Sequence, residues 1–394
     1  MPNVVGSLAA AGLGMSRAAA AVMAGMLSGE ARTEWRELEN KLHAFEWFSF
    51  AGPRLGLDAA GPAARAAALS DAYTGFWAME GVGYVCARAG VSEDLPPREL
   101  LSGARAGDPA ADSGLGRLAD LSARAAVLLS TGSALAAAEG LLAVIAQAET
   151  SGRREQGTGR ATAHGQVEEA ARGSGSAAGA AGTDRELVRL WLERCRDDVH
   201  PGYPELAVEA LGLVARTLHP WRLPRLDELL AAADPALAEY LWHGAGRGLY
   251  FVPMHLLPWS GGCRRAFAKA RSEPPHQAGR RNATAGLAWA STLVNVRSPE
   301  VAEAALAGCG EEPDAERAIA NGASSALLVW RQWAGADRLL DRFLAYQPPA
   351  ADRAQTWRRR VIEPCRTALA ASPPDFRRRG ELAALFRFQV APDA

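Results

Sequence analysis

Residues 33–50 read TEWRELENKLHAFEWFSF, a stretch whose large apolar side chains recur at the spacing of one helix face. Those side chains are Trp35, Leu38, Leu42, Phe45 and Trp47. The spacing predicts a helix over this stretch, and the same kind of pattern returns along the chain.

Further helices are predicted over residues 184–196, 205–218, 234–251, 281–296, 299–307, 314–333, 352–371 and 376–388. A long Ala and Leu pattern over 115–148 predicts two helices that are separated near Thr131 and Gly132. Pro364 is expected to kink or interrupt the helix over 352–371, because proline has no amide hydrogen to donate. We find no apolar and polar alternation bounded by turn residues, so the predicted fold class is all-α, with many helices.

Residues 151–183 differ from the rest of the chain in composition. They read SGRREQGTGRATAHGQVEEAARGSGSAAGAAGT, with no aromatic residue and with Val167 as the only large aliphatic one. Such a stretch buries too little apolar surface to offset the entropy cost of ordering, so we expect a flexible Gly/Ala-rich linker. The linker divides the 394 residues into an N-terminal helical half, 1–150, and a C-terminal helical half, 184–394.

Two glycine-containing segments indicate a relation between the halves. Residues 80–84, EGVGY, echo residues 243–247, HGAGR, and a helix rich in Gly and Ala follows each. Glycine inside a helix costs about 1 kcal/mol relative to alanine, so its repetition needs a reason. The pattern predicts an internal duplication, with helices that approach closely through small-residue faces. Ala and Gly richness inherited from a GC-rich genome is the alternative explanation.

Composition and charge exclude several classes of protein. Lys and Arg number 43 against 44 Asp and Glu, and this balance argues against a general nucleic-acid binder. The five cysteines form no Cys-x-x-Cys, so we expect neither a disulfide framework nor a metal site. The Ala/Gly-rich N-terminus is interpreted as a soluble helix, and no run of about 18 strongly apolar residues follows it. A cytoplasmic protein without a membrane span is therefore expected.

Residues 239–259, EYLWHGAGRGLYFVPMHLLPW, hold the densest set of reactive groups. His243 and Arg247 are four residues apart and share a helix face, and Tyr250 follows one turn after Arg247. A neighbouring guanidinium disfavours the imidazolium, so His243 is expected to be neutral and able to accept a proton. His243, Arg247 and Tyr250 are the candidate catalytic residues. In the alternative interpretation, they make polar contacts in a structural seam between helices.

Five further residues are candidates for substrate binding. Glu80 lies in an otherwise apolar helix, where a carboxylate is either paired with an arginine or shifted in pKa. Asn295 and Arg297 stand at a helix end, where such residues also cap and tether the chain. Trp242 and Trp289 either fill the core or line a tunnel for a long apolar ligand. The motifs of P-loop, zinc-protease and α/β-hydrolase sites are missing, so no cofactor is assigned.

Six segments resemble one protein family. They are GFWAMEG at 75–81, TGSALAAAE at 131–139, HPGY at 200–203, WHGAGRGLYF at 242–251, NATAGLAWA at 282–290 and LVNVRSPEV at 293–301. These segments are similar to the domain of unknown function 1702, in particular to its members encoded in enediyne natural-product gene clusters, the UnbL type. The resemblance covers residues 70–370.

The resemblance implies an accessory protein of enediyne biosynthesis. Such a protein acts with the enediyne polyketide synthase and other accessory proteins on a polyene-derived intermediate while the enediyne core forms. One position departs from the family pattern, because Ser130 stands where a His precedes the Thr-Gly pair. Two other functions stay open: a non-catalytic scaffold that holds intermediates or partner enzymes, and a self-resistance protein that sequesters the product.

Overall fold

The computed structural model describes residues 2–49, 66, 69, 71–89, 123–159, 169–197, 204–252, 262–307, 312–372 and 383–389 of the chain. Every long regular element within these ranges is a helix, which confirms the predicted all-α class. The N-terminal elements are α1 (Pro2–Met26), α2 (Gly29–Ser49), α5 (Ala72–Ala89), α7 (Ala123–Gly159) and α8 (Glu169–Asp197).

The remaining elements follow after residue 203. They are α9 (Pro204–Leu218), a 3₁₀ turn (Pro220–Arg222), α10 (Leu223–Ala233), α11 (Pro235–Phe251), α12 (Gly262–Ser272), α13 (Gln277–Val294), α14 (Pro299–Ala307), α15 (Pro313–Ala334), α16 (Arg338–Ala345), α17 (Ala351–Trp357), a π-helical turn (Arg358–Ile362) and α18 (Glu363–Ala371). The helix predicted over 376–388 lies mostly outside the described residues.

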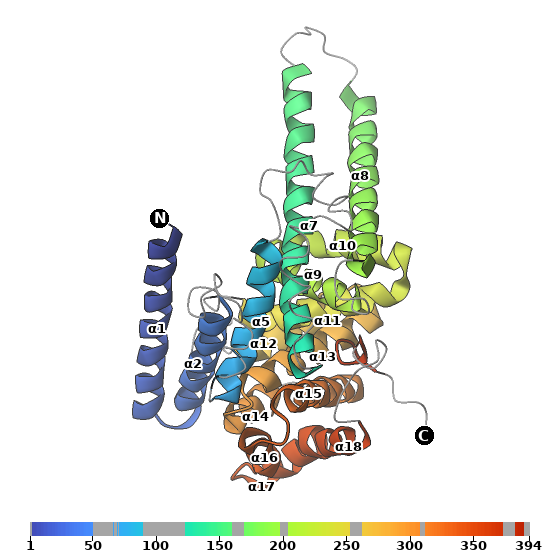
Figure 1. Cartoon of the computed structure of the whole chain (residues 1–394). Coiled ribbons are helices and arrows are strands. Elements are labelled where there is room, and N and C mark those ends of the chain that lie inside the picture. The colour runs from blue at the N-terminus through green and yellow to red at the C-terminus, as the bar shows by residue number, and fades with distance from the viewer. Residues whose placement is uncertain are drawn as a thin grey trace.

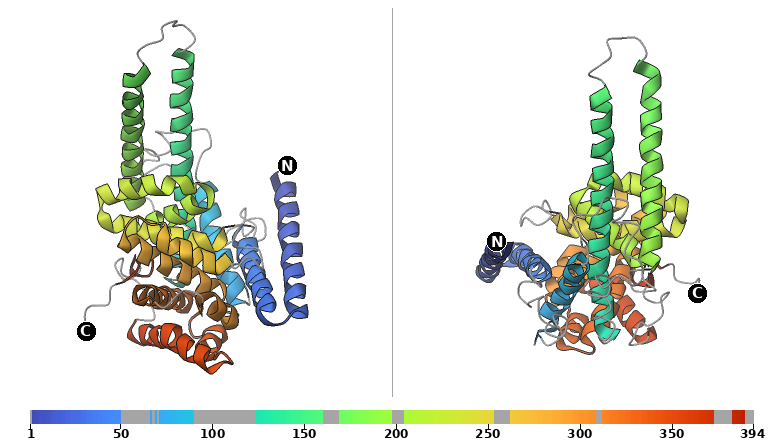
Figure 2. Two further views of the ribbon diagram at one scale, coloured as in Figure 1. Left: turned by 180° about the vertical axis from the view of Figure 1, so that it is seen from behind. Right: turned by 45° about the horizontal axis from the view of Figure 1, so that its top comes forward.

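The helices form two crossed layers. α9, α11, α13 and α15 pack one on the next in a row, while α5 and α7 pair with each other and run across that row (Figure 1). α7 and α8 rise side by side beyond the row, and α1 and α2 form a hairpin at its edge (Figure 2). One hydrophobic core includes residues from both expected halves; the rings of Phe76 and Trp330, for example, stack with centroids 5.8 Å apart.

Paired glycines bring three neighbouring helix pairs into close contact: α5 with α7, α9 with α11, and α11 with α13. A Cβ atom added at any of these glycines would overlap the backbone of the facing helix, which confirms the predicted close approach. Each glycine lies against the carbonyl oxygen of the residue three positions before its partner glycine. The pairs are Gly83 with Gly132, Gly212 with Gly244, and Gly246 with Gly286.

The repeated glycines therefore mark one kind of helix crossing. The glycines at the crossing of α9 with α11 have the same register as those at the crossings of α5 with α7 and of α11 with α13. The latter two crossings contain the similar segments 80–84 and 243–247. The echo is explained by this shared geometry, and an internal duplication stays a prediction.

The predicted break in the helix over 115–148 is wrong. α7 runs without interruption from Ala123 to Gly159 and passes through Thr131 and Gly132. Gly132 weakens a helix on its own, but here it permits the contact with α5, so tertiary packing outweighs local propensity. Pro364 behaves as predicted, since α17 ends before it and a π-helical turn leads into α18.

Helical backbone also occupies much of the stretch predicted as a linker. Residues 151–159 extend α7 and residues 169–183 belong to α8, while 160–168 lie outside the described part of the chain. Alanine, glutamate and arginine in this stretch have high helix propensity, and this outweighs the scarcity of large apolar side chains. Part of the stretch is therefore helical where composition indicated no regular structure, and the flexible linker and the division of the chain into domains at 150 and 184 stay predictions.

Within the described ranges, one stretch, Val127–Thr150 of α7, is long and apolar enough to cross a membrane. Of its most apolar window, 78% is buried inside the protein, as in the core helix of a globular fold.

Candidate functional site

Helix α11 carries the predicted catalytic residues into the protein interior. Asp234 caps its first turn, because the side chain accepts a hydrogen bond of 2.9 Å from the amide of Ala236, and Pro235 suits the first helical position. Since α9 and α13 pack on α11 from both sides, His243, Arg247 and Tyr250 are all buried.

His243 and Arg247 converge on two carboxylates. Glu209 on α9 contacts both side chains. Its Oε1 lies 3.1 Å from His243 Nδ1, and its Oε2 accepts a hydrogen bond of 2.8 Å from Arg247. A second guanidinium nitrogen of Arg247 lies 3.6 Å from Oε1 of Glu80 on α5. All four side chains are almost fully buried. We call Glu80, Glu209, His243 and Arg247 the buried charge cluster.

The cluster has more acid than base. If both carboxylates are ionised and the imidazole is neutral, its net charge is −1, which is unfavourable in a low-dielectric core. Burial raises the pKa of Glu80 to about 7, and Glu209 adds to this shift while Arg247 opposes it. Burial also lowers the pKa of His243, although Glu209 partly opposes that shift. Glu80 is therefore the group that gains or loses a proton near neutral pH.

Backbone contacts fix three members of the cluster. The carbonyl oxygens of Glu80, Glu209 and His243 are the ones that lie against Gly132, Gly244 and Gly286. The backbone of each of these three residues therefore contacts a glycine of the neighbouring helix, and this contact fixes the position from which the titratable side chain extends.

The two candidate tryptophans have different surroundings. The guanidinium of Arg247 stacks over the Trp289 ring at 4.2 Å, so Trp289 lies beside the cluster. Trp289 Nε1 and Arg247 Nε are buried, and neither has a hydrogen-bond partner within the described residues. Trp242 instead donates a hydrogen bond of 2.8 Å to Asp227, which also lies 3.1 Å from His276 Nε2. Trp242 therefore belongs to a separate contact with α10.

Tyr250, Asn295 and Arg297 meet in a second polar network, which α2 completes. Asn295 donates a hydrogen bond of 2.7 Å to the Tyr250 hydroxyl and another of 2.7 Å to the carbonyl of Ser291. Asn40 on α2 donates to Asn295 at 2.9 Å and accepts from Arg297 at 2.8 Å. Asn295 also stands at the C-cap of α13, so the expected capping role and the tether to other helices coincide in this residue.

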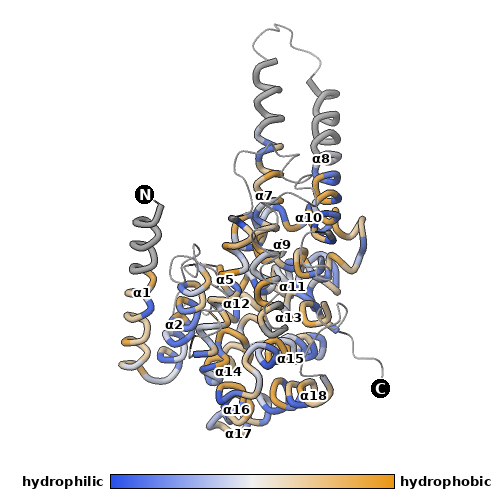
Figure 3. The backbone as a smooth tube through the Cα atoms, viewed as in Figure 1, coloured by the Kyte–Doolittle hydropathy of each residue, from blue (hydrophilic) through white to orange (hydrophobic). Residues whose placement is uncertain are grey.

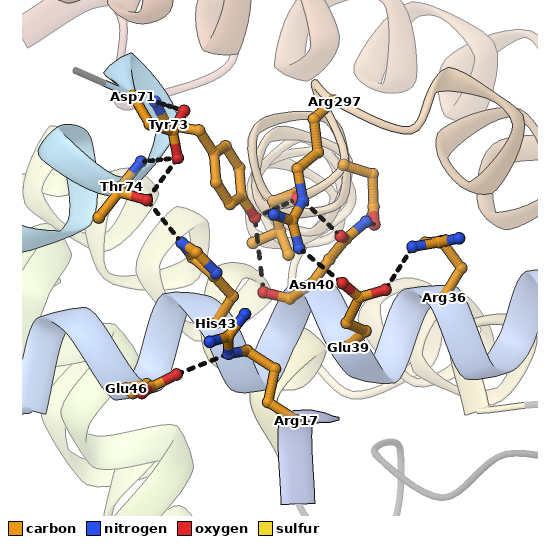
Figure 4. A network of polar contacts seen from close by, with 12 residues as sticks. Arg17, Arg36, Glu39, Asn40, His43, Glu46, Asp71, Tyr73, Thr74 and Arg297 are labelled. Atoms are coloured by element: carbon orange, nitrogen blue, oxygen red, sulfur yellow. Dashed lines mark hydrogen bonds and ion pairs between the residues drawn. The ribbon is translucent and has the colours of Figure 1, made fainter. Parts of the chain in front are cut away.

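Figure 4 shows how this network continues over α2 and α5. Arg297 reaches Glu39 at 3.5 Å and lies over the Tyr73 ring at 4.6 Å. Farther along α2, His43 Nε2 lies 3.0 Å from the Thr74 hydroxyl. We call the contacts among Asn40, Tyr250, Asn295 and Arg297 the α2 network.

Sequence reasoning identified most of these residues but missed Glu209. Glu209 could have been found by the same pattern as Glu80, since both are acidic residues in the middle of an apolar helix. The sequence of α9 is PELAVEALGLVARTL. Asn40 carried no such signal, since amide side chains are common in amphipathic helices. Ser130, the position that the resemblance singled out, is buried within α7.

Among the residues that the structure describes, no group of three or more His, Cys, Asp and Glu is placed to hold a metal ion. Comparison of the chain with family models, with curated proteins and with solved structures finds no match.

Proposed function

We propose that this protein is a cytoplasmic accessory protein of enediyne biosynthesis. It acts on a polyene-derived intermediate supplied by the enediyne polyketide synthase, and the buried charge cluster is its catalytic centre. The resemblance of six sequence segments supports the pathway, and the cluster supports a chemical role within it.

The observation that carries the chemical role is the burial of two carboxylates around one guanidinium. Removing charges from water costs several kcal/mol each, and well-packed apolar residues in such places are often more stable by about 1–4 kcal/mol. A protein that keeps an acid-rich cluster in its core is therefore a candidate for catalysis at that place. The cluster has the partners that proton transfer needs, because Glu80 exchanges a proton near neutral pH and Arg247 lies beside its carboxylate.

The proposed roles follow from the contacts. Protonated Glu80 donates a proton to the intermediate, and its carboxylate is then stabilised by Arg247. Glu209 stays bound to His243 and Arg247 and holds both in place, while neutral His243 is the proton acceptor. Trp289, which is buried between Arg247 and Phe386, is the proposed aromatic contact for a conjugated chain.

The test is an in-frame deletion of the gene in its producer, followed by mass spectrometry for accumulated polyene. We expect the deletion strain to lose the enediyne, and a wild-type copy to restore it. Copies with Glu80→Gln or His243→Gln should fail at equal protein level. Glu303→Gln is the matched control, because Glu303 is also buried and paired with an arginine, Arg353, but lies on α14.

Two outcomes separate the parts of this proposal. An unchanged enediyne titre in the deletion strain would contradict the pathway. A restored titre from Glu80→Gln would contradict the role of the cluster and leave the pathway assignment intact.

A scaffold is the second candidate function, and the surface of α1 favours it. Met15, Val22 and Met26 are exposed on α1, and the coloured part of this helix in Figure 3 carries fewer hydrophilic residues than α2. Exposed apolar surface of this kind is typical of interaction sites. If the protein is a scaffold, Val22→Asp should abolish co-purification with the polyketide synthase, and Glu80→Gln should leave production unchanged.

A further inference from the structure

Lysine is rare in this chain, and one of its two lysines is buried. Of the 43 Lys and Arg residues, only Lys41 and Lys269 are lysine. Lys269 lies on α12 with half of its side chain exposed, whereas 1% of the Lys41 side chain is exposed. At the other buried ion pairs, including those of Arg216, Arg247 and Arg360, the cation is an arginine. A requirement for positive charge alone would be met by arginine, which tolerates burial better.

The surroundings of Lys41 contain the groups that amine chemistry requires. Its Nζ lies 2.9 Å from Glu37 Oε1 on the same helix and 3.9 Å from the centroid of the Tyr250 ring. Glu37 also interacts with the Tyr250 hydroxyl, so one carboxylate serves both groups. Burial raises the pKa of Tyr250 well above its ordinary value, which keeps the phenol protonated.

Glu37 is the more exposed member of the pair. Its side chain is 17% exposed, although Oε1, the carboxylate oxygen nearest Lys41 Nζ, is itself buried. Besides burial, the side chains that act on the pKa of Tyr250 at this contact are Glu37 on α2, Cys263 on α12 and Asn295.

We propose that Lys41 is a nucleophilic amine that takes an aldehyde or ketone as an imine. The Glu37 carboxylate accepts a proton from the Lys41 ammonium, and the neutral amine adds to the carbonyl carbon. The resulting carbinolamine takes the proton back from Glu37, loses water and becomes the protonated imine, which is paired with the Glu37 carboxylate. Neither an oxidant nor a reductant is needed. The inference does not rest on the buried charge cluster or on the enediyne assignment.

The test uses the full chain, 2,4-hexadienal and sodium cyanoborohydride, which reduces an imine to a stable secondary amine. Peptide mapping by mass spectrometry then gives the labelling rates of Lys41 and Lys269 in the same sample. Exposed Lys269 reports the unassisted reaction, and we expect Lys41 to be labelled faster. Glu37→Gln should slow labelling of Lys41 by about 100-fold, the lower end of general acid–base catalysis, without changing Lys269.

The result that overturns the proposal is labelling of Lys41 that is slower than, or equal to, that of Lys269 in the wild-type protein. Lys41 is then a structural cation. Equal rates of Lys41 labelling in wild type and in folded Glu37→Gln also contradict it. The wild-type comparison needs no variant, so a substitution that prevents folding cannot obscure the answer. Lys41→Arg, checked by circular dichroism, confirms the mapped position.

Discussion

Gly286 lies against the carbonyl oxygen of His243, so closely that an added methyl group at position 286 would overlap that oxygen. Gly286→Ala must therefore push α13 away from α11. Overpacking typically lowers the free energy of unfolding by about 1–3 kcal/mol. Because the added methyl group overlaps backbone atoms, we expect a loss at or above the upper end of this range. Urea denaturation followed by circular dichroism measures the loss. Gly140→Ala is the matched control in α7, where no atom lies near the added methyl group, and it should be neutral or stabilising by about 1 kcal/mol.

Glu80 makes the stability of the protein depend on pH. Because its folded pKa of about 7 exceeds the ordinary 4.5, its contribution is fully favourable below pH 4.5 and is lost as the pH rises to 7. Between these pH values, the free energy of unfolding of the wild type should fall relative to Glu80→Gln, by up to about 3 kcal/mol. Denaturant titrations of both proteins from pH 4.5 to 7.5 measure the difference, and parallel curves would contradict the assignment of the proton to Glu80.

Removing one partner of the Glu209–Arg247 ion pair leaves the other charge buried. Glu209→Met should therefore destabilise the fold by about 3–5 kcal/mol. Below the pKa of Glu80, where that carboxyl is protonated, the double variant Glu209→Met with Arg247→Met should recover a large part of the loss, because no unpaired charge remains. A thermodynamic double-mutant cycle measures the coupling. Additive effects of the two substitutions would show that the ion pair contributes nothing to stability.

Tyr250→Phe keeps the ring below Lys41 and removes the hydroxyl that accepts a hydrogen bond from Asn295. A buried donor that loses its acceptor costs about 1–3 kcal/mol, so thermal unfolding should occur at a lower temperature. Tyr346→Phe, at a half-buried position after α16, is the control and should change stability by less than about 0.5 kcal/mol. Equal unfolding temperatures for the two variants would mean that the hydroxyl of Tyr250 is replaceable by water.

The sequence predicts the helices better than it predicts where they end. Residues 33–49 and 235–251 form helices because their apolar spacing, and the Asp234 cap of the second stretch, are local properties. Gly132 was interpreted as a break because its neighbour α5, which makes glycine favourable there, is distant in sequence. Residues 169–183 belong to α8 although composition indicated a linker there, because their helix propensity outweighs the scarcity of large apolar side chains.

The site was predictable in part. His243 and Arg247 share a face of α11 by helical geometry, and the structure brings Glu80 to the same place. Which carboxylate binds His243 was not predictable, because Glu209 lies on another helix and its partner is chosen by packing. Lys41 was not predicted because a lysine in an amphipathic helix ordinarily faces solvent, and its burial against Glu37 and Tyr250 depends on the packing of α2 on α11.

The crossings between α5, α7, α9, α11 and α13 limit how this protein can change during evolution. Main-chain atoms touch directly at the paired glycines, so no rotamer change can accommodate a larger residue there. A substitution at these positions therefore displaces a whole helix at once. Substitutions in the interior are therefore confined to side chains elsewhere, such as Trp289, while the backbone spacing of Glu80, Glu209 and His243 stays unchanged.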